Sequence, residues 1–154
     1  MSIATIAEAP RANIFDGEIN QDLLTGLVAE ALAKAQIAAV SLRDTVVPAW
    51  PPARRTFPEH VARRLERRKV FDETFVEDLN TFIETLAARI RSETYVGWEA
   101  DENHVRGGYE VCYADDATHA LIRCAKELRS VQEAITAVLF GLRAMRIANE
   151  LLEY

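Results

Sequence analysis

The residues with the strongest chemical character lie in a cationic block between positions 54 and 69. Seven cationic side chains stand there against Glu59 and Glu66, a local balance of +5 in a chain of net charge −6. Like-charged pairs four positions apart cost a helix roughly 0.2–0.5 kcal/mol each. The block therefore predicts a surface for an anion or an acidic partner, with a solvated or internally neutralised face as the alternative. Its members are Arg54, Arg55, Arg63, Arg64, Arg67, Arg68 and Lys69.

A second cluster is acidic and aromatic. Between Glu93 and Asp116 there are seven acidic residues and one basic residue, with Tyr and Trp interleaved. Such aromatic residues are favoured interface anchors and can hold organic cations. We predict a recognition element for a basic partner; the alternative is that the aromatic rings pack on the protein body. The candidate residues are Tyr95, Trp98, Asp101, Glu102, Tyr109 and Tyr113.

The signals for a metal site are weak. Asp115 and His119 stand four positions apart, so one helix face would present both as ligands. No CxxC, HxxxH or ExxH pair accompanies them, and we expect neither a metal nor a cofactor. Low cysteine use suggests a reducing cytoplasm and free thiols, although a Cys112–Cys124 disulfide stays open.

No sequence signature of catalysis is present. The serines lack a GxSxG turn, and the glycines form neither a phosphate loop nor a dinucleotide fingerprint. The residues favour a non-catalytic protein, while a small helical enzyme stays an alternative.

Most of the chain has helical periodicity. Residues 1–17 are interpreted as an N-terminal arm and residues 18–154 as one helical domain. We predict helices over 20–44, 58–69, 72–92 and 117–154, capped by Asn20, a Thr56/Glu59 capping box, Asp72, and Asp115 or Asp116. Four prolines predict an extended crossing over 47–58, pinned to the body by Trp50. Short β-prone runs around a Gly-Gly turn predict a hairpin over 94–113.

The last predicted helix is apolar on two faces. Its first face runs from Leu121 to Leu152 with 3-4 spacing. A second face begins halfway along and contains Phe140, Ile147, Leu151 and Tyr154. A helix that is apolar on two faces must be covered on both. This pattern predicts a homo-oligomer, most simply a dimer, unless Ile14 and Phe15 of the arm supply the cover.

The predicted fold class is mainly α: a bundle of about four helices with a long C-terminal helix and a small β-hairpin inserted before it. The predicted function is a regulatory, adaptor or assembly protein that acts through the basic helix and the acidic hairpin. A metal-binding protein or enzyme, and a nucleic-acid-associated factor using the cationic block, are the alternatives. The acidic net charge disfavours nucleic acid as a partner. The chain contains no run of about 18 apolar residues, so we expect no membrane span. The N-terminus lacks a secretory pattern, so we expect a cytoplasmic protein.

Overall fold

The computed structural model describes residues 17–100 and 108–152, with side chains over 21–94 and 114–152. The helices are α2 (Gly17–Ser41), α3 (Val47–Ala49), α4 (Thr56–Glu66), α5 (Glu73–Glu93) and α6 (Asp116–Leu152). A π-helical turn, Leu42–Val46, joins α2 to α3, and a 3-10 turn, Pro52–Arg54, precedes α4. Two strands, β1 (Tyr95–Ala100) and β2 (Gly108–Tyr113), lie between α5 and α6.

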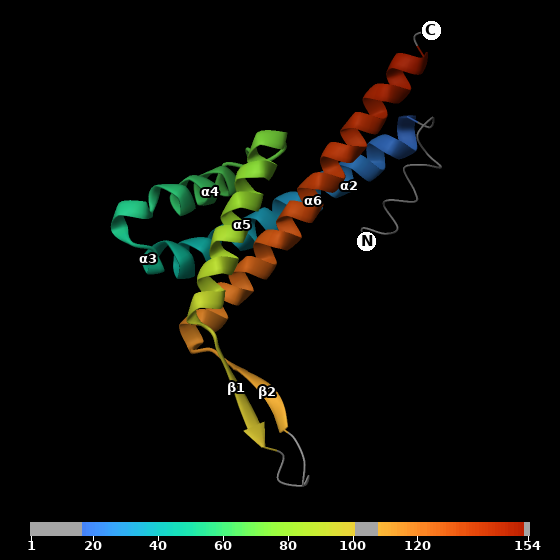
Figure 1. Cartoon of the computed structure of the whole chain (residues 1–154). Helices are drawn as coiled ribbons and strands as arrows, with labels where there is room; N and C mark the ends of the chain where they lie inside the picture. The colour runs from blue at the N-terminus through green and yellow to red at the C-terminus, as the bar shows by residue number, and fades with distance from the viewer. Residues whose placement is uncertain (1–16, 101–107, 153–154) are drawn as a thin grey trace.

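The bundle is organised around α6 (Figure 1). Helix α2 runs antiparallel to it, because Leu24 lies beside Gly141 while Ser41 lies beside Cys124. Helix α5 is also antiparallel to α6: Arg143 pairs with Glu73 at one end, and Thr118 donates a hydrogen bond to Glu93 at the other. Helix α4 packs on α2 and α5. The predicted helical bundle is confirmed.

Small residues occupy the buried face of α2. Ala31, Ala35 and Ala38 are fully buried. Alanine at a helix contact shortens the distance between the two helix axes. Large side chains from the other elements, including Phe75 and Phe82, are also fully buried and belong to the same core.

The extended proline-rich crossing was a wrong prediction. The helix starts at Gly17, three residues before the predicted cap Asn20, and continues through the π-helical turn to Ala49. A wider turn just before Pro48 removes the clash that a proline ring makes with the carbonyl four residues earlier. Only Trp50 and Pro51 are extended before the 3-10 turn begins.

Trp50 pins this segment to the body, as predicted. Its side chain is buried. The ring centroid lies 5.8 Å from that of Phe82, and the Arg89 guanidinium stacks over it at 4.8 Å.

The predicted capping box at the start of α4 is also wrong. Arg55 is the residue before the helix, and it has helical dihedral angles with no side-chain cap. An N-cap residue needs an extended backbone to turn its side chain back onto the first turn. The 3-10 turn leads directly into α4, so Thr56 lies inside the helix. The inward face of α4 buries Val61 and Leu65, and Phe57 packs edge-on against Phe82 at 5.3 Å.

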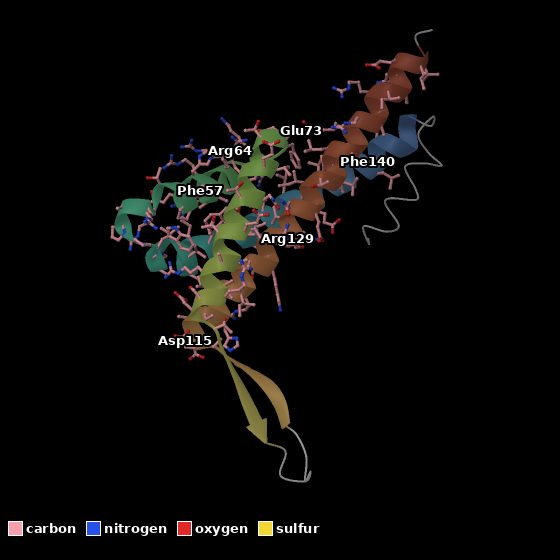
Figure 2. All side chains as sticks on the ribbon, in the orientation of Figure 1. Phe57, Arg64, Glu73, Asp115, Arg129 and Phe140 are labelled. Atoms are coloured by element: carbon pink, nitrogen blue, oxygen red, sulfur yellow. The ribbon has the colours of Figure 1, made fainter. Side chains whose placement is uncertain are left out.

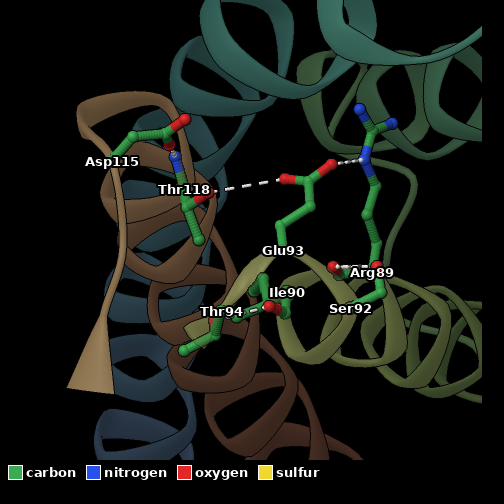
Figure 3. Close-up of polar contacts among 7 residues, drawn as sticks. All are labelled: Arg89, Ile90, Ser92, Glu93, Thr94, Asp115 and Thr118. Atoms are coloured by element: carbon green, nitrogen blue, oxygen red, sulfur yellow. Dashed lines mark hydrogen bonds and ion pairs between the residues drawn. The ribbon is translucent and has the colours of Figure 1, made fainter. Parts of the chain in front are cut away.

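Two predicted caps are confirmed. The Asp72 carboxylate accepts the backbone N–H of Phe75 at 2.7 Å, and Asp115 accepts that of Thr118 at 2.7 Å. Figure 3 shows how the second cap joins a polar chain that closes this end of the bundle. The Thr118 hydroxyl donates to Glu93 at 3.4 Å, and Glu93 in turn accepts from Arg89 Nε at 3.1 Å.

The predicted fold class needs one correction: the small β-hairpin is not a component of the bundle. Strands β1 and β2 pair antiparallel with each other, from Tyr95 opposite Tyr113 to Ala100 opposite Gly108. They run out from the end of the helices instead of packing along them (Figure 1). The compact fold is therefore helical throughout, without a sheet layer. Aromatic and β-branched residues indicate strand preference, but they do not show whether a hairpin joins the core.

Gly26 provides a test of the described packing. It lies inside α2, and a methyl group added there would meet no atom within 4 Å. Because alanine loses less conformational entropy than glycine in a helix, Gly26→Ala should raise the free energy of unfolding by about 0.5–1 kcal/mol. Urea denaturation followed by circular dichroism measures this change. A loss of stability would mean that the position is covered by something other than solvent.

Candidate functional site

The cationic block divides into arginines that build the fold and cations that face solvent. Arg55 donates to the carbonyls of Trp50 and Pro48, at 2.9 and 3.0 Å, and so closes the C-terminal end of α3. Arg64 pairs with Asp72, donates to the Lys69 carbonyl at 2.6 Å and stacks over Phe75 at 5.1 Å. Figure 2 shows Arg64 beside the start of α5. These two arginines are structural.

The other five cations are exposed: Arg54, Arg63, Arg67, Arg68 and Lys69. Within the described residues none of them forms an ion pair. Four of them gather at the C-terminal end of α4, which we call the basic tip: Arg63, Arg67, Arg68 and Lys69. Arg54 lies at the opposite end of α4.

The basic tip keeps most of its positive charge. Glu66, the acidic residue in the last turn of α4, is already paired with Arg43, N to O 2.6 Å. The carbonyl end of a helix favours nearby cations, but this effect is confined to the last turn and is worth about 0.3–1 kcal/mol for each charge. The helix dipole alone does not require four cations at one helix end.

Arg68 has an unusual backbone at the centre of the basic tip. Its φ is 59°, in the left-handed region. Its N–H donates to the Leu65 carbonyl at 3.3 Å, and that of Lys69 to the Arg64 carbonyl at 3.1 Å. This pattern is the Schellman helix ending, whose left-handed position is usually glycine. A side chain there costs roughly 1–2 kcal/mol. The sequence does not predict this helix ending, because no glycine marks it.

Asp72 connects the tip to α5 electrostatically. The Phe75 N–H that it accepts lowers the pKa of the Asp72 carboxyl below its ordinary value, and the neighbouring Arg64 guanidinium lowers it further. The carboxylate is therefore ionised at neutral pH and serves both as a helix cap and as the counterion of Arg64. It does not neutralise the rest of the tip.

The acidic aromatic cluster lies on β1, on β2 and between them. The side chains of Tyr95, Trp98, Tyr109 and Tyr113 lie outside the described residues, as do Asp101 and Glu102 entirely. Their predicted role in binding a basic partner stays a prediction.

The weak metal candidates have structural explanations. Asp115 is the cap of α6, and its pKa is lowered by the Thr118 backbone N–H that it accepts. His119 is exposed. Within residues 21–94 and 114–152, no three His, Cys, Asp or Glu side chains gather as metal ligands. Cys124 is a free, buried thiol, and burial raises its pKa to about 11, so it is a poor nucleophile.

A second surface is apolar and lies along the C-terminal part of α6. The first apolar face is buried from Leu121 to Val138, but Leu142 and Leu152 are 44% and 71% exposed. On the second face, Phe140, Ile147 and Leu151 are exposed, and Figure 2 shows Phe140 on the outside of α6. Tyr154 lies outside the described residues. Burial of such a side chain contributes roughly 1.5–3 kcal/mol, so this surface could supply substantial binding energy.

Helix lengths explain why this part of α6 is uncovered. The 37 residues of α6 and the 21 residues of α5 correspond to about 55 and 31 Å. Helix α5 begins at Glu73, which pairs with Arg143. The part of α6 after Arg143 therefore extends beyond α5. Helix α2 lies on a different face, where Leu24 meets Gly141.

One helical stretch, Gln21–Ala49, is long and apolar enough to cross a membrane by length and composition alone. This finding differs from the expectation that the chain contains no apolar run long enough for a membrane span. It carries the Glu30–Lys34 ion pair, N to O 3.2 Å, in its middle and contributes Ala31, Ala35 and Leu42 to the core. Ile37 and Val40 on its outer side are exposed. Packing in the bundle accounts for part of its apolar character.

The structure thus brings together four of the predicted cations at one helix end and assigns Arg55 and Arg64 to the fold. The predicted oligomer face is exposed at its three described positions. Comparisons with protein-family models, with curated proteins and with solved structures found no match to this chain.

The division of the cationic block can be tested by stability. Arg64→Gln removes the Asp72 pair and the contact with Phe75, and should lower the free energy of unfolding by about 1 kcal/mol after solvent screening of the half-exposed pair. Arg67→Gln, a matched change on the same helix, should stay within about 0.5 kcal/mol of the original protein. Equal effects in urea denaturation would contradict the assignment.

The Asp72 carboxylate should make stability depend on pH. Its pKa is lowered in the folded protein from the ordinary value of 3.8, so its contribution is complete above 3.8 and is lost as the pH falls through the folded value. Asp72→Asn keeps a capping side chain and removes the charge. The stability difference between the two proteins should therefore be constant near neutral pH and shrink in acid. A difference that persists in strong acid would assign it to shape instead of charge.

Proposed function

We propose that this chain is a non-catalytic helical interaction protein that binds an acidic segment of a partner protein through the basic tip. The observation that carries the proposal is Arg68: a cation occupies a left-handed position where glycine would be less strained. Strain of this kind is retained where the surrounding structure or the function requires it. Exposed Arg63, Arg67 and Lys69 surround it.

The charge distribution favours an acidic protein over nucleic acid. The chain has a net charge of −6, so its remaining surface repels a long polyanion that extends past the tip. A short acidic segment can contact the four cations without approaching that surface. Arginine also suits carboxylates, because its planar guanidinium donates two parallel hydrogen bonds.

Binding can be measured by fluorescence anisotropy with a labelled glutamate-rich peptide of about 20 residues. Arg63→Gln, Arg67→Gln and Arg68→Gln combined should weaken binding about tenfold or more, since each exposed charge contact is worth roughly 0.2–1 kcal/mol. The matched control combines Arg91→Gln, Arg123→Gln and Lys126→Gln, which are exposed elsewhere and remove the same charge. This control should bind almost normally.

Two outcomes would count against the proposal. Equal weakening by both triple variants would mean that only net charge matters. Tighter binding of a DNA duplex than of the peptide, with a steep decline as salt rises, would support the nucleic-acid alternative instead.

Arg68 separates function from folding with a single substitution. Arg68→Gly should raise the free energy of unfolding by about 1 kcal/mol, because glycine adopts the left-handed backbone without strain. The same variant should bind the acidic peptide more weakly. Thermal denaturation and anisotropy on one preparation measure both effects. If the variant is more stable and binds equally well, Arg68 has no part in recognition.

A further inference from the structure

We infer that the C-terminal part of α6 pairs antiparallel with the same segment of a second copy of this chain. The contact surface is a stripe of Phe140, Ala144, Ile147 and Leu151, which we call the α6 stripe. Phe140, Ile147 and Leu151 are 57%, 45% and 60% exposed, and Ala144 is half-buried. Their spacing of four, three and four residues places all of them on one helix face. This surface is separate from the basic tip.

The described helices of the same chain do not cover the α6 stripe. Helix α5 reaches only as far as Arg143, through its first residue Glu73. Helix α2 packs where Gly141 faces Leu24 and Leu27, about a third of a turn away from the stripe. In Figure 1 the end of α6 extends beyond the start of α5. A segment other than the described helices of this chain is needed to bury these side chains.

The charges beside the stripe favour a second copy in the antiparallel direction. Arg143, Arg146 and Glu150 all lie on the same flank of the stripe, by helical spacing. When two identical helices pack antiparallel about a twofold axis, each flank meets the same flank of the other helix. With the axis at Ile147, Arg146 of one copy faces Glu150 of the second copy. Arg143, which pairs with Glu73 of its own chain, lies beside this contact. Opposite charges therefore meet on both sides of the axis.

Parallel pairing would lose this complementarity. The charged flank would then face the opposite flank, which contains Ala148, already buried in its own chain. Arg146 is exposed and forms no ion pair with any described residue. The antiparallel direction gives it a partner.

The surface next to Phe140 gives the antiparallel copy a place to end. A groove of about 320 Å³ runs between α5 and α6, with Val76, Leu139 and Phe140 among its lining residues. With the axis at Ile147, Leu151 and Leu152 of the second copy lie opposite Arg143 and Leu142, so the last turn of its α6 reaches the Arg143 end of this groove. The groove has an apolar floor, and Glu77 and Arg143 line it as well.

The oligomeric state is the first test. Sedimentation velocity between about 1 and 100 μM should show a dimer of the 17.3 kDa chain. Ile147→Glu should raise the dimer dissociation constant about 100-fold or more, because it places a charge at the centre of an apolar contact. Ile37→Glu is the matched control: this isoleucine is 59% exposed on α2 and should leave the dimer intact. Circular dichroism checks that both variants keep their helices.

Cover of the α6 stripe by the N-terminal arm, instead of by a second copy, would give a different sedimentation result. If the N-terminal arm of the same chain covers the stripe, the wild-type protein sediments as a monomer at every concentration, and Ile147→Glu lowers its stability without changing its mass. That result overturns the inference. Equal dissociation by Ile147→Glu and Ile37→Glu would also overturn it, since the contact would not be specific to α6.

Direction is tested by cross-linking and by charge exchange. In a Cys112→Ser background, Ile147→Cys should cross-link through a short bis-maleimide, whereas Phe140→Cys should not, because its two copies lie about 21 Å apart along the axis. Arg146→Glu should weaken the dimer about tenfold, and Glu150→Arg added to it should restore most of the affinity. Cross-linking at Phe140, or no recovery in the double variant, would rule out the antiparallel arrangement.

Discussion

The packing of α6 between α2 and α5 is the constraint on which the rest of the structure depends. Both neighbours run antiparallel to α6 and are shorter than it, so the bundle can bury only part of its length. From Leu121 to Val138 the inward face is closed. Beyond that region the same 3-4 pattern continues without a described partner. One mismatch in helix length therefore produces both a well-packed core and an exposed apolar surface.

Arginine contacts hold the remaining elements on this framework. Arg89 stacks on Trp50 and pairs with Glu93, which accepts from Thr118 at the start of α6. Arg64 similarly connects the end of α4 to the Asp72 cap of α5. Such guanidinium groups can bind carbonyl and carboxylate oxygens together, so they connect the ends of neighbouring elements. This is why part of the cationic block belongs to the fold instead of to a binding site.

Sequence reasoning predicted what periodicity and local side chains determine. The helical bundle, the caps Asp72 and Asp115 and the anchoring role of Trp50 all follow from residue type and spacing. The start of α4 did not, because a 3-10 turn can align the backbone without a capping side chain. The prolines predict an extended crossing, but a π-helical turn accommodates Pro48 within a helix. The division of the arginines could not be predicted, since it depends on contacts such as Arg64 with Asp72 across a loop.

The basic tip and the α6 stripe share one physical property: each is maintained at a cost to the isolated chain. Arg68 accepts a backbone conformation that suits glycine, and Ile147 and Leu151 keep apolar surface in water. The costs differ in kind, because the first is steric and local whereas the second depends on solvent and can be recovered by association. A surface of the second kind favours a permanent contact, since it is unfavourable whenever it is open. A charged tip stays well hydrated when empty, so it suits a partner that binds and leaves. The two surfaces lie on different helices, so the proposed assembly through α6 and the proposed recognition through α4 do not compete for the same residues.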